Sequence, residues 1–348
     1  METTGKGMCW SLMVPVMTTR QLLDSSDRSR MIEINVQRTI SSLLFTQGGK
    51  QILSSDARGM LQRWRADDGH EADEPIQTGT TIFPVALSPD CRWLVCGLCR
   101  LDARKTDVRV WDAQTHWPWH EKDLDIKGHT GLITSISISP DSTKLATGGH
   151  DELVFIWSMA TGERLVGPLQ HEGWVRNLAF SPTGDRIATA TVCEVSTRSQ
   201  IGIYDSNNGQ RLLVIPFLFY PNMWSPLAWS ADGRQLFATS GNEVKRFDTS
   251  LGSLLSKWSV PGSGQTASIV LSRNQKFAVA VKWQSLSFWD TSTEKQIGTV
   301  ITYKSDISSI MLSPDDNCIA TGDGRGKIIL QSLRDIVPSP YLIVNVSD

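Results

Sequence analysis

The sequence predicts an all-β protein made of seven similar units, each with four short strands. Two landmarks recur along the chain at steps of 41 to 51 residues, and no long helical hydrophobic period interrupts them. The first landmark is a turn of the Ser-Pro-Asp type. The second follows 17 to 23 residues later and is aromatic in six of the seven units. Two landmarks that stay in step along most of the chain indicate a repeat protein.

The turn landmark is made of residues that favour tight turns. Ser-Pro-Asp itself stands at 88–90, 139–141 and 313–315. Side chains of Ser and Asp bond to nearby backbone groups, and Pro sets the backbone angle that such turns need. The seven turns begin at Thr46, Ser88, Ser139, Ser181, Ser230, Ser272 and Ser313. The second landmark stands at Trp64, Trp111, Trp157, Tyr204, Phe247, Trp289 and, without an aromatic ring, Leu330.

Each unit can be divided into four strands around these landmarks. In the third unit an apolar strand at 135–139 precedes the turn, and a second at 144–149 follows it. A third strand at 153–157 ends at the aromatic landmark, and a more polar fourth covers 163–169. These runs have strand length, β-branched residues and Gly, Pro or Asp at their ends.

This pattern resembles the WD-repeat β-propeller family. The resemblance lies in the Ser-Pro-Asp turns, in aromatic-Asp pairs such as Trp111-Asp112, and in Gly128-His129 before the third unit. It implies a seven-bladed propeller with four antiparallel strands in each blade. We expect a partly irregular N-terminal extension at 1–30, the propeller at 31–334 and a C-terminal tail at 335–348. The fold by itself does not determine a function.

The resemblance also implies a polar brace in the third blade, formed by His129, Thr147, Asp151 and Trp157. The indole N–H only donates, the hydroxyl and neutral His do both, and Asp accepts, so every group can find a partner. Asp, His and a hydroxyl are also the parts of a nucleophile triad. Here the hydroxyl lies on a strand and no oxyanion donors are positioned, so we expect a structural brace and no catalytic residue.

Other blades retain the brace only in part, so we expect the third blade to be the most rigid. Blade 4 keeps His171 and Thr189. The position of Asp151, six residues before the aromatic landmark, is occupied by Arg58 in blade 1, Lys105 in blade 2, Arg198 in blade 4 and Gly324 in blade 7.

The last blade needs a fourth strand from elsewhere, because its third strand ends near residue 333. A closed ring leaves few exposed strand edges. One candidate strand is Met31–Asn35, and the other is 341–346 in the tail. The habit of the resembled family favours Met31–Asn35.

Strand direction places two sets of loops on one face, which we call the top face. They are the turns between second and third strands and the links from blade to blade. Extra residues enter these turns at 99–107 and 192–200. Aromatic, Met and Arg side chains are favoured at interface hot spots. The candidate partner-binding residues are Trp174, Arg176, Met223, Trp224, Arg100 and Arg104. The alternatives are that Trp174 only caps its blade and that the basic loop is simply solvated.

Composition argues against several classes of partner. Lys and Arg number 34 against 36 Asp and Glu, so the net charge of −2 does not favour direct nucleic-acid binding. The apolar segment Met8–Met17 is too short to span a membrane, and its flanks do not fit a signal peptide. Six scattered Cys favour a reducing compartment. We expect an intracellular protein, cytoplasmic or nuclear.

No cofactor or metal site is predicted. Cys96 and Cys99 are half of a zinc site, but no second pair follows at ligand spacing. His116 and His120 flank a Pro-broken turn without well-placed acidic neighbours. The sequence has no phosphate loop, nucleophile elbow or His-Glu-x-x-His motif. Residues 322–327 (GDGRGK) resemble a phosphate loop only in composition.

The leading hypothesis is a non-enzymatic scaffold or adaptor that belongs to a complex and binds proteins or peptides through its top-face loops. The first alternative is the sensor portion of a larger NTPase-linked signalling protein, which requires sequence beyond this chain. A remote alternative is a hydrolase with its site at the mouth of the central channel, which requires converging polar groups there.

Overall fold

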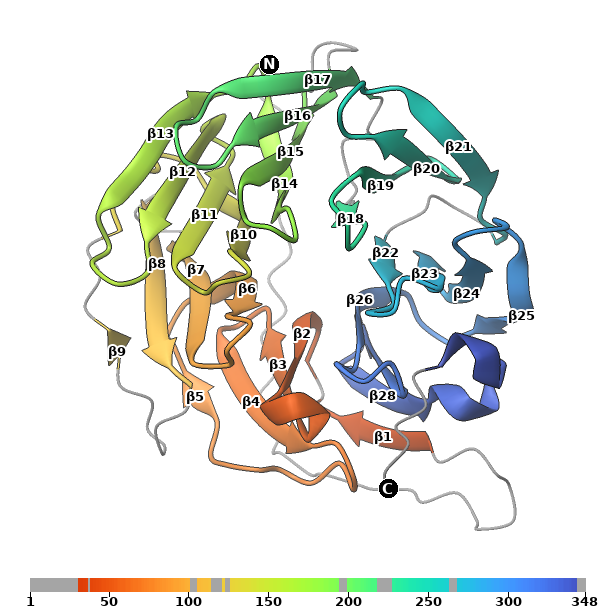
Figure 1. Cartoon of the computed structure of the whole chain (residues 1–348). Coiled ribbons are helices and arrows are strands. Elements are labelled where there is room, and N and C mark those ends of the chain that lie inside the picture. The colour runs from red at the N-terminus through yellow and green to blue at the C-terminus, as the bar shows by residue number, and fades with distance from the viewer. Residues whose placement is uncertain are drawn as a thin grey trace, which may run out of the picture.

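Seven sheets of four antiparallel strands stand as blades in a ring (Figure 1). The computed structural model describes residues 31–36, 38–100, 105–113, 121–122, 126–193, 199–217, 227–262 and 268–342. Within these residues there is no α-helix, and the helical elements are the 3-10 helices η1 (Gln47–Gly49), η2 (Leu333–Asp335) and η3 (Ser339–Tyr341). The predicted seven-bladed β-propeller is confirmed.

The blades follow the chain, and each blade counts its strands outward from the central axis. Blades 1 to 3 consist of β2 (Ile40–Thr46), β3 (Gln51–Asp56), β4 (Met60–Arg65) and β5 (Ile76–Gln77); β6 (Thr81–Leu87), β7 (Trp93–Arg100), β8 (Lys105–Asp112) and β9 (Glu121–Lys122); and β10 (Ile133–Ile138), β11 (Lys144–Gly149), β12 (Leu153–Ser158) and β13 (Arg164–Gln170).

Blades 4 to 7 repeat this order, and only the last takes a strand from the other end of the chain. They consist of β14 (Trp174–Phe180), β15 (Arg186–Val192), β16 (Gln200–Asp205) and β17 (Arg211–Pro216); β18 (Ala228–Trp229), β19 (Gln235–Ser240), β20 (Glu243–Asp248) and β21 (Leu254–Ser259); β22 (Ser268–Leu271), β23 (Phe277–Lys282), β24 (Ser285–Asp290) and β25 (Gln296–Thr302); and β26 (Ile307–Leu312), β27 (Cys318–Asp323), β28 (Lys327–Ser332) and β1 (Met31–Asn35).

The Ser-Pro-Asp turns owe their recurrence to one hydrogen-bonding pattern. In blade 3 the Ser139 hydroxyl donates to Asp141 (2.5 Å) and accepts from the backbone N–H of Lys144 (2.9 Å). The side chain therefore closes the turn and satisfies the first N–H of the next strand. The same backbone-to-hydroxyl bond recurs at Ser88, Ser181, Ser230, Ser272 and Ser313.

The hydrophobic core lies between blades rather than inside one blade. One cluster packs Ala146 and Ile156 of blade 3 against Val175, Leu178 and Ile187 of blade 4. The other clusters likewise combine neighbouring blades. A four-stranded sheet alone has two apolar faces, so each blade needs a neighbour on both sides.

Polar side chains join the innermost strands of neighbouring blades. The Ser135 hydroxyl accepts from the N–H of Leu178 (3.0 Å), and the Ser309 hydroxyl accepts from the N–H of Leu43 (3.0 Å). Both serines stand where the strand register shifts, in β10 and β26. The residues that these bulges leave unpaired, Thr134 and Ser308, also donate to the next blade, at Val175 O and Ile40 O.

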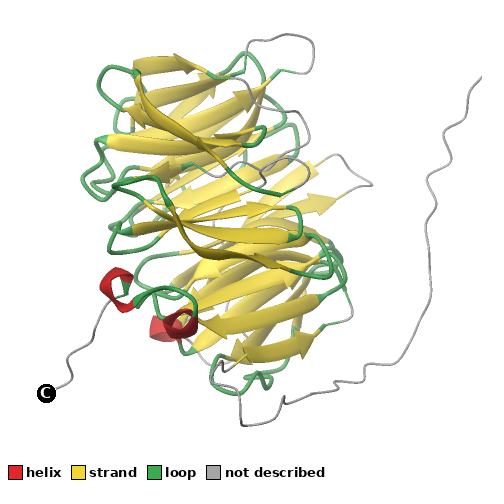
Figure 2. Cartoon of the chain, turned by 90° about the vertical axis from the view of Figure 1, so that its right-hand side faces the viewer, coloured by secondary structure: helices red, strands yellow, loops and turns green. Residues whose placement is uncertain are grey.

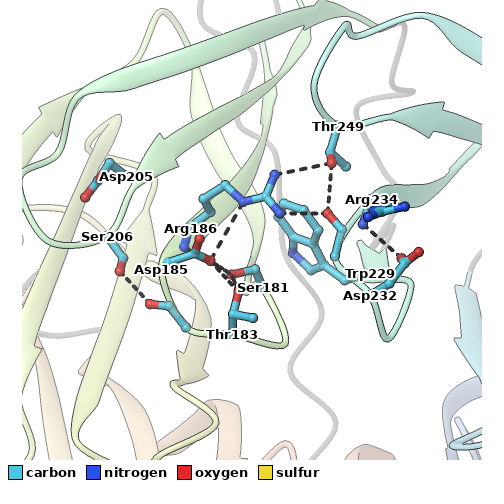
Figure 3. Close-up of polar contacts among 12 residues, drawn as sticks. Ser181, Thr183, Asp185, Arg186, Asp205, Ser206, Trp229, Asp232, Arg234 and Thr249 are labelled. Atoms are coloured by element: carbon cyan, nitrogen blue, oxygen red, sulfur yellow. Dashed lines mark hydrogen bonds and ion pairs between the residues drawn. The ribbon is translucent and has the colours of Figure 1, made fainter.

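On the face opposite the top face, basic side chains cross the seams between blades. Arg186 begins β15 and reaches into blade 5, where its guanidinium donates to Gly233 O (2.7 Å) and Thr249 Oγ1 (3.3 Å). The guanidinium also lies 5.1 Å from the centre of the Trp229 ring (Figure 3). Arg246 of blade 5 makes a similar contact with Glu294 of blade 6 (2.7 Å).

The N-terminal strand closes the ring, as expected. β1 pairs antiparallel with β28, from Met31 opposite Gln331 to Asn35 opposite Lys327 (Figure 1). Ile34 is buried at this closure and belongs to a core cluster with Trp64 and Ile328. The other candidate strand begins at Tyr341, but Tyr341 ends η3, and residues 343–348 lie outside the described part of the chain.

The described part of the tail, up to Leu342, packs against blades 6 and 7. Val337 and Leu342 are buried in the same cluster as Phe277 and Phe288. The Tyr341 hydroxyl donates to Asp290 (2.7 Å). Figure 2 shows the short helices of this segment beside the sheets. The expected N-terminal extension, residues 1–30, lies outside the described residues.

Removing the core side chain at the closure should destabilise the whole ring. Ile34→Ala leaves a cavity between the first and last blades, and we expect the free energy of unfolding to fall by about 2–4 kcal/mol. The matched control is Leu165→Ala, on the outermost strand of blade 3, where the side chain is 50% exposed. Urea denaturation measures both. Equal losses in the two variants would contradict a stabilising closure at β1.

Candidate functional site

The four predicted brace residues lie in one chain of hydrogen bonds across blade 3. Trp157 Nε1 donates to Thr147 Oγ1 (2.9 Å), which lies 2.8 Å from His129 Nε2. His129 Nδ1 lies 2.9 and 3.0 Å from the two carboxylate oxygens of Asp151. Asp only accepts and the indole only donates, so a neutral His with its proton on Nδ1 satisfies every member.

The brace is withdrawn from solvent. The side chains of His129 and Asp151 are 2% and 4% exposed, and Thr147 is fully buried. Burial alone would raise the pKa of Asp151, but hydrogen bonds from His129 and from the N–H groups of Thr130 and Leu153 outweigh it and lower the pKa. A nucleophile must reach its substrate, and the Thr147 hydroxyl cannot. The geometry therefore fits a structural role.

Blade 4 contains a shorter version of the brace. His171 Nε2 lies 3.0 Å from Thr189 Oγ1, and His171 Nδ1 lies 2.9 Å from the backbone oxygen of Leu169. The backbone carbonyl thus takes the place of the carboxylate. Tyr204 stands where blade 3 has its Trp, and its ring packs 5.2 Å from that of His171. Arg198, at the position expected for the carboxylate, lies outside the described residues.

The carboxylates of Asp56 and Asp323, which the alignment of the repeat units did not select, bind backbone N–H groups in the top turns of blades 1 and 7. We expected Arg58 and Gly324 to occupy the place of Asp151. Instead, Asp56 accepts from the N–H groups of Arg58 (2.8 Å) and Met60 (2.9 Å). Asp323 accepts likewise from Arg325 and Lys327. The available signal was the shared Asp-x-Arg-Gly sequence at 56–59 and 323–326.

Trp174 joins blades 3 and 4 on the top face. It begins β14, is half-buried, and stacks on His150 with ring centres 4.2 Å apart and planes 17° apart. His150 lies in the turn between β11 and β12, directly before Asp151 of the brace. The Arg176 guanidinium lies 5.1 Å from the Trp174 ring. We call Trp174, His150 and Arg176 the aromatic platform.

The remaining predicted contact residues do not join this platform in the described part of the chain. Arg100 ends β7, but its side chain is not described. Arg104, Met223 and Trp224 lie outside the described residues, as do His116 and His120.

Trp283 is a top-face residue that the sequence reasoning did not select. It lies in the tight turn between β23 and β24, and its side chain is 51% exposed. Its φ of 51° lies in the left-handed region, which bulky residues rarely adopt. The available signal was a Trp between two strands in place of the usual Gly or Asn.

The described residues contain no group of three or more His, Cys, Asp or Glu that could hold a metal ion. Cys96 is fully buried in β7, and burial raises the pKa of its thiol well above the ordinary value. In the same part of the chain, no helix has the length and apolar character needed to cross a membrane.

Comparison with known proteins agrees with this geometry. A family model described as "WD domain, G-beta repeat" matches residues 121–158 and 164–195, which include the brace of blade 3 and the start of blade 4. Over these segments the chain is similar to the WD-repeat family. The matched WD-repeat segments hold both His-to-Thr hydrogen bonds described above.

Several known proteins are similar over part of the chain. Small ribosomal subunit protein RACK1 of Candida albicans is 34% identical over 130 residues, or 36% of this chain and 39% of that protein. Eukaryotic translation initiation factor 3 subunit I of the same organism is 25% identical over 221 residues, or 58% and 62%. Apoptotic protease-activating factor 1 of Homo sapiens is 28% identical over 162 residues, or 44% and 12%. The matches thus span less than two thirds of these relatives.

Breaking the brace should destabilise the propeller. His129→Ala leaves Thr147 and Asp151 buried with fewer partners, and we expect the free energy of unfolding to fall by about 1–3 kcal/mol. His70→Ala is the control, because the His70 side chain is 54% exposed. Thermal and urea unfolding measure both variants. An unchanged unfolding midpoint in His129→Ala would argue against the brace.

The buried His of blade 4 predicts a loss of stability in mild acid. Burial lowers the pKa of His171 from its ordinary 6.5, so the unfolded chain takes up the proton at a higher pH than the folded chain. The stabilisation is present above pH 6.5 and is lost as the pH falls below this value. We expect the decline between about pH 7.5 and about pH 5.5 to be shallower in His171→Asn than in the parent chain, by urea titration at each pH.

Proposed function

We propose that this WD-repeat protein is a non-enzymatic scaffold or adaptor that binds other proteins through its top face. The observation that carries the proposal is the aromatic platform. Trp174, His150 and Arg176 lie where two blades meet, directly above the hydrogen-bonded brace of blade 3. A rigid, partly exposed Trp beside an Arg has the composition of an interface hot spot.

The relatives support a role within an assembly. Two of them are named as parts of larger assemblies: one is a small ribosomal subunit protein and the other is a subunit of an initiation factor. Both names belong to intracellular machinery, and the described Cys91, Cys96 and Cys318 are free thiols. We infer that this protein works in the cytoplasm or nucleus as a subunit of a complex, without direct contact with nucleic acid. Residues 31–334 would form its binding unit, flanked by the extension and the tail.

A second candidate is the sensor portion of a larger NTPase-linked signalling protein. The similarity to apoptotic protease-activating factor 1 favours it, because the matched segment makes up only 12% of that protein. A segment similar to this chain can thus form a small part of a much longer protein. The two candidates share the top face as contact surface and differ in whether the partner lies in the same polypeptide.

Affinity capture from the native source, followed by mass spectrometry, tests the proposal. We expect Trp174→Ala to reduce recovery of at least one partner by about tenfold, because hot-spot Trp residues contribute about 2 kcal/mol or more. Leu251→Ala is the matched control, since Leu251 is 76% exposed on the opposite face. Trp224→Ala serves as a second variant on the expected top face. Full recovery of every partner in both Trp variants would contradict this contact surface.

A further inference from the structure

The top turns of blades 1 and 7 share one sequence and one structure. Each begins with an Asp that accepts two backbone N–H groups and ends with a Gly at positive φ, 86° at Gly59 and 84° at Gly326. A Cβ at Gly59 would lie 1.9 Å from Thr80 O, and one at Gly326 would lie 2.3 Å from Arg38 N. In both blades the link to the next blade therefore passes directly over the glycine.

This construction leaves one Arg exposed in each turn. Arg58 and Arg325 stand at the third position, and both are exposed. The carboxylates of Asp56 and Asp323 are buried and occupied by backbone N–H groups, with exposed fractions of 2% and 9%. In each turn the Asp side chain thus stabilises the backbone, and the Arg guanidinium is not needed for this.

Arg38 connects the two turns. Its backbone lies against Gly326 of blade 7, and its guanidinium lies 3.4 Å from the Asp56 carboxylate of blade 1. Its side chain is 37% exposed. Three guanidiniums therefore follow the seam where the ring closes, far from the aromatic platform on blades 3 and 4.

Trp283 extends this surface over blade 6. The backbone oxygen of Trp283 accepts from the N–H of Ile307 (2.9 Å), and the neighbouring Asp306 oxygen accepts from the N–H of Gly324 (3.2 Å). The Trp turn is thus joined to the Arg325 turn through one link. A bulky residue at positive φ is strained, and the exposed ring contributes little to the core, so the fold alone does not account for a Trp here.

The charge on this surface is opposite in sign to that of the whole chain. The net charge of the protein is −2, yet these turns and links carry four exposed or partly exposed cations, the three Arg and Lys304 of the link between β25 and β26, against the buried carboxylates of Asp56 and Asp323. Their exposed acidic neighbour is Asp306, which already accepts from the Gln284 amide (3.0 Å). Four cations and one exposed Trp suit a short peptide better than a nucleic acid, which needs a longer basic stripe.

We propose that Arg38, Arg58, Arg325 and Trp283 form a docking surface for an acidic peptide segment of a protein partner. Carboxylates of the peptide would pair with the guanidiniums, whose planar forks match carboxylate geometry, and an apolar side chain would cover the Trp283 ring. The inference rests on the proposed function and assigns a partner chemistry to a second region of the same face.

Fluorescence polarisation with labelled 12-residue peptides tests it on the full chain. The probe pool carries four Asp or Glu around one Leu or Phe, and the matched pool replaces each acid by its amide. We expect the acidic pool to bind at least about tenfold more tightly, with affinity that falls as salt rises. Arg58→Gln with Arg325→Gln should weaken binding about tenfold, and Trp283→Ala by a similar factor.

The control is Arg92→Gln with Arg234→Gln, two exposed Arg on the opposite face, which should bind within about twofold of the parent chain. Unfolding midpoints verify that all variants fold.

Three outcomes would overturn the inference. They are equal binding of the amide pool, unaltered binding in the Arg58 and Arg325 variant, and selection of phosphopeptides or RNA over the carboxylate pool. Trp174-dependent capture of a partner without any acidic-peptide binding would overturn it while leaving the proposed function intact. Absence of both acidic-peptide binding and Trp174-dependent capture would overturn the inference and the proposed function together.

Discussion

Each blade of this protein depends on its two neighbours, because both faces of every sheet are apolar. The cluster around Ile34 is the clearest example of this dependence. It combines Ile34 of β1 with Trp64 of blade 1 and Ile328 of blade 7, so residues from the two ends of the chain enclose one core. A missing closing strand would expose that core and one strand edge together. Ring closure is therefore a condition for the stability of the other blades.

The ring also determines where polar groups can be buried. Neighbouring blades shield the interior of each blade, so an indole N–H or a strand hydroxyl that has no protein partner there costs free energy. Blade 3 solves this with the complete chain from Trp157 to Asp151. Blade 4 ends its chain on the backbone oxygen of Leu169. Different blades thus satisfy the same requirement with different groups, which explains why the repeat is regular in spacing and irregular in sequence.

The two faces of the ring carry side chains of different kinds. On one face, Ser hydroxyls close the turns, and side chains such as Arg186 hold neighbouring blades together (Figure 3). On the top face, side chains that the core does not need are displayed. The two proposed contact surfaces, the aromatic platform and the Arg and Trp283 surface, lie on different blades, so two partners, or two segments of one partner, would have room to bind at the same time. Loops carried by a stable scaffold commonly serve this purpose.

The resemblance to the WD-repeat family supplied the four brace residues and favoured Met31–Asn35 as the closing strand. The sequence by itself determined the seven repeat units and the strand order within each, because turn chemistry and strand periodicity are local properties. It did not reveal that Asp56 and Asp323 replace the expected carboxylate. A shift of one or two residues in a turn depends on how the backbone passes under the next link.

Only the tertiary structure decided which distant side chains meet. The stacking of His150 on Trp174, the span of Arg38 between the first and last blades, and the packing of Leu342 beside Phe277 join residues whose separation in sequence follows no period. These contacts depend on how adjacent blades are rotated against each other. Hydrophobic patterning within one blade carries no information about that rotation.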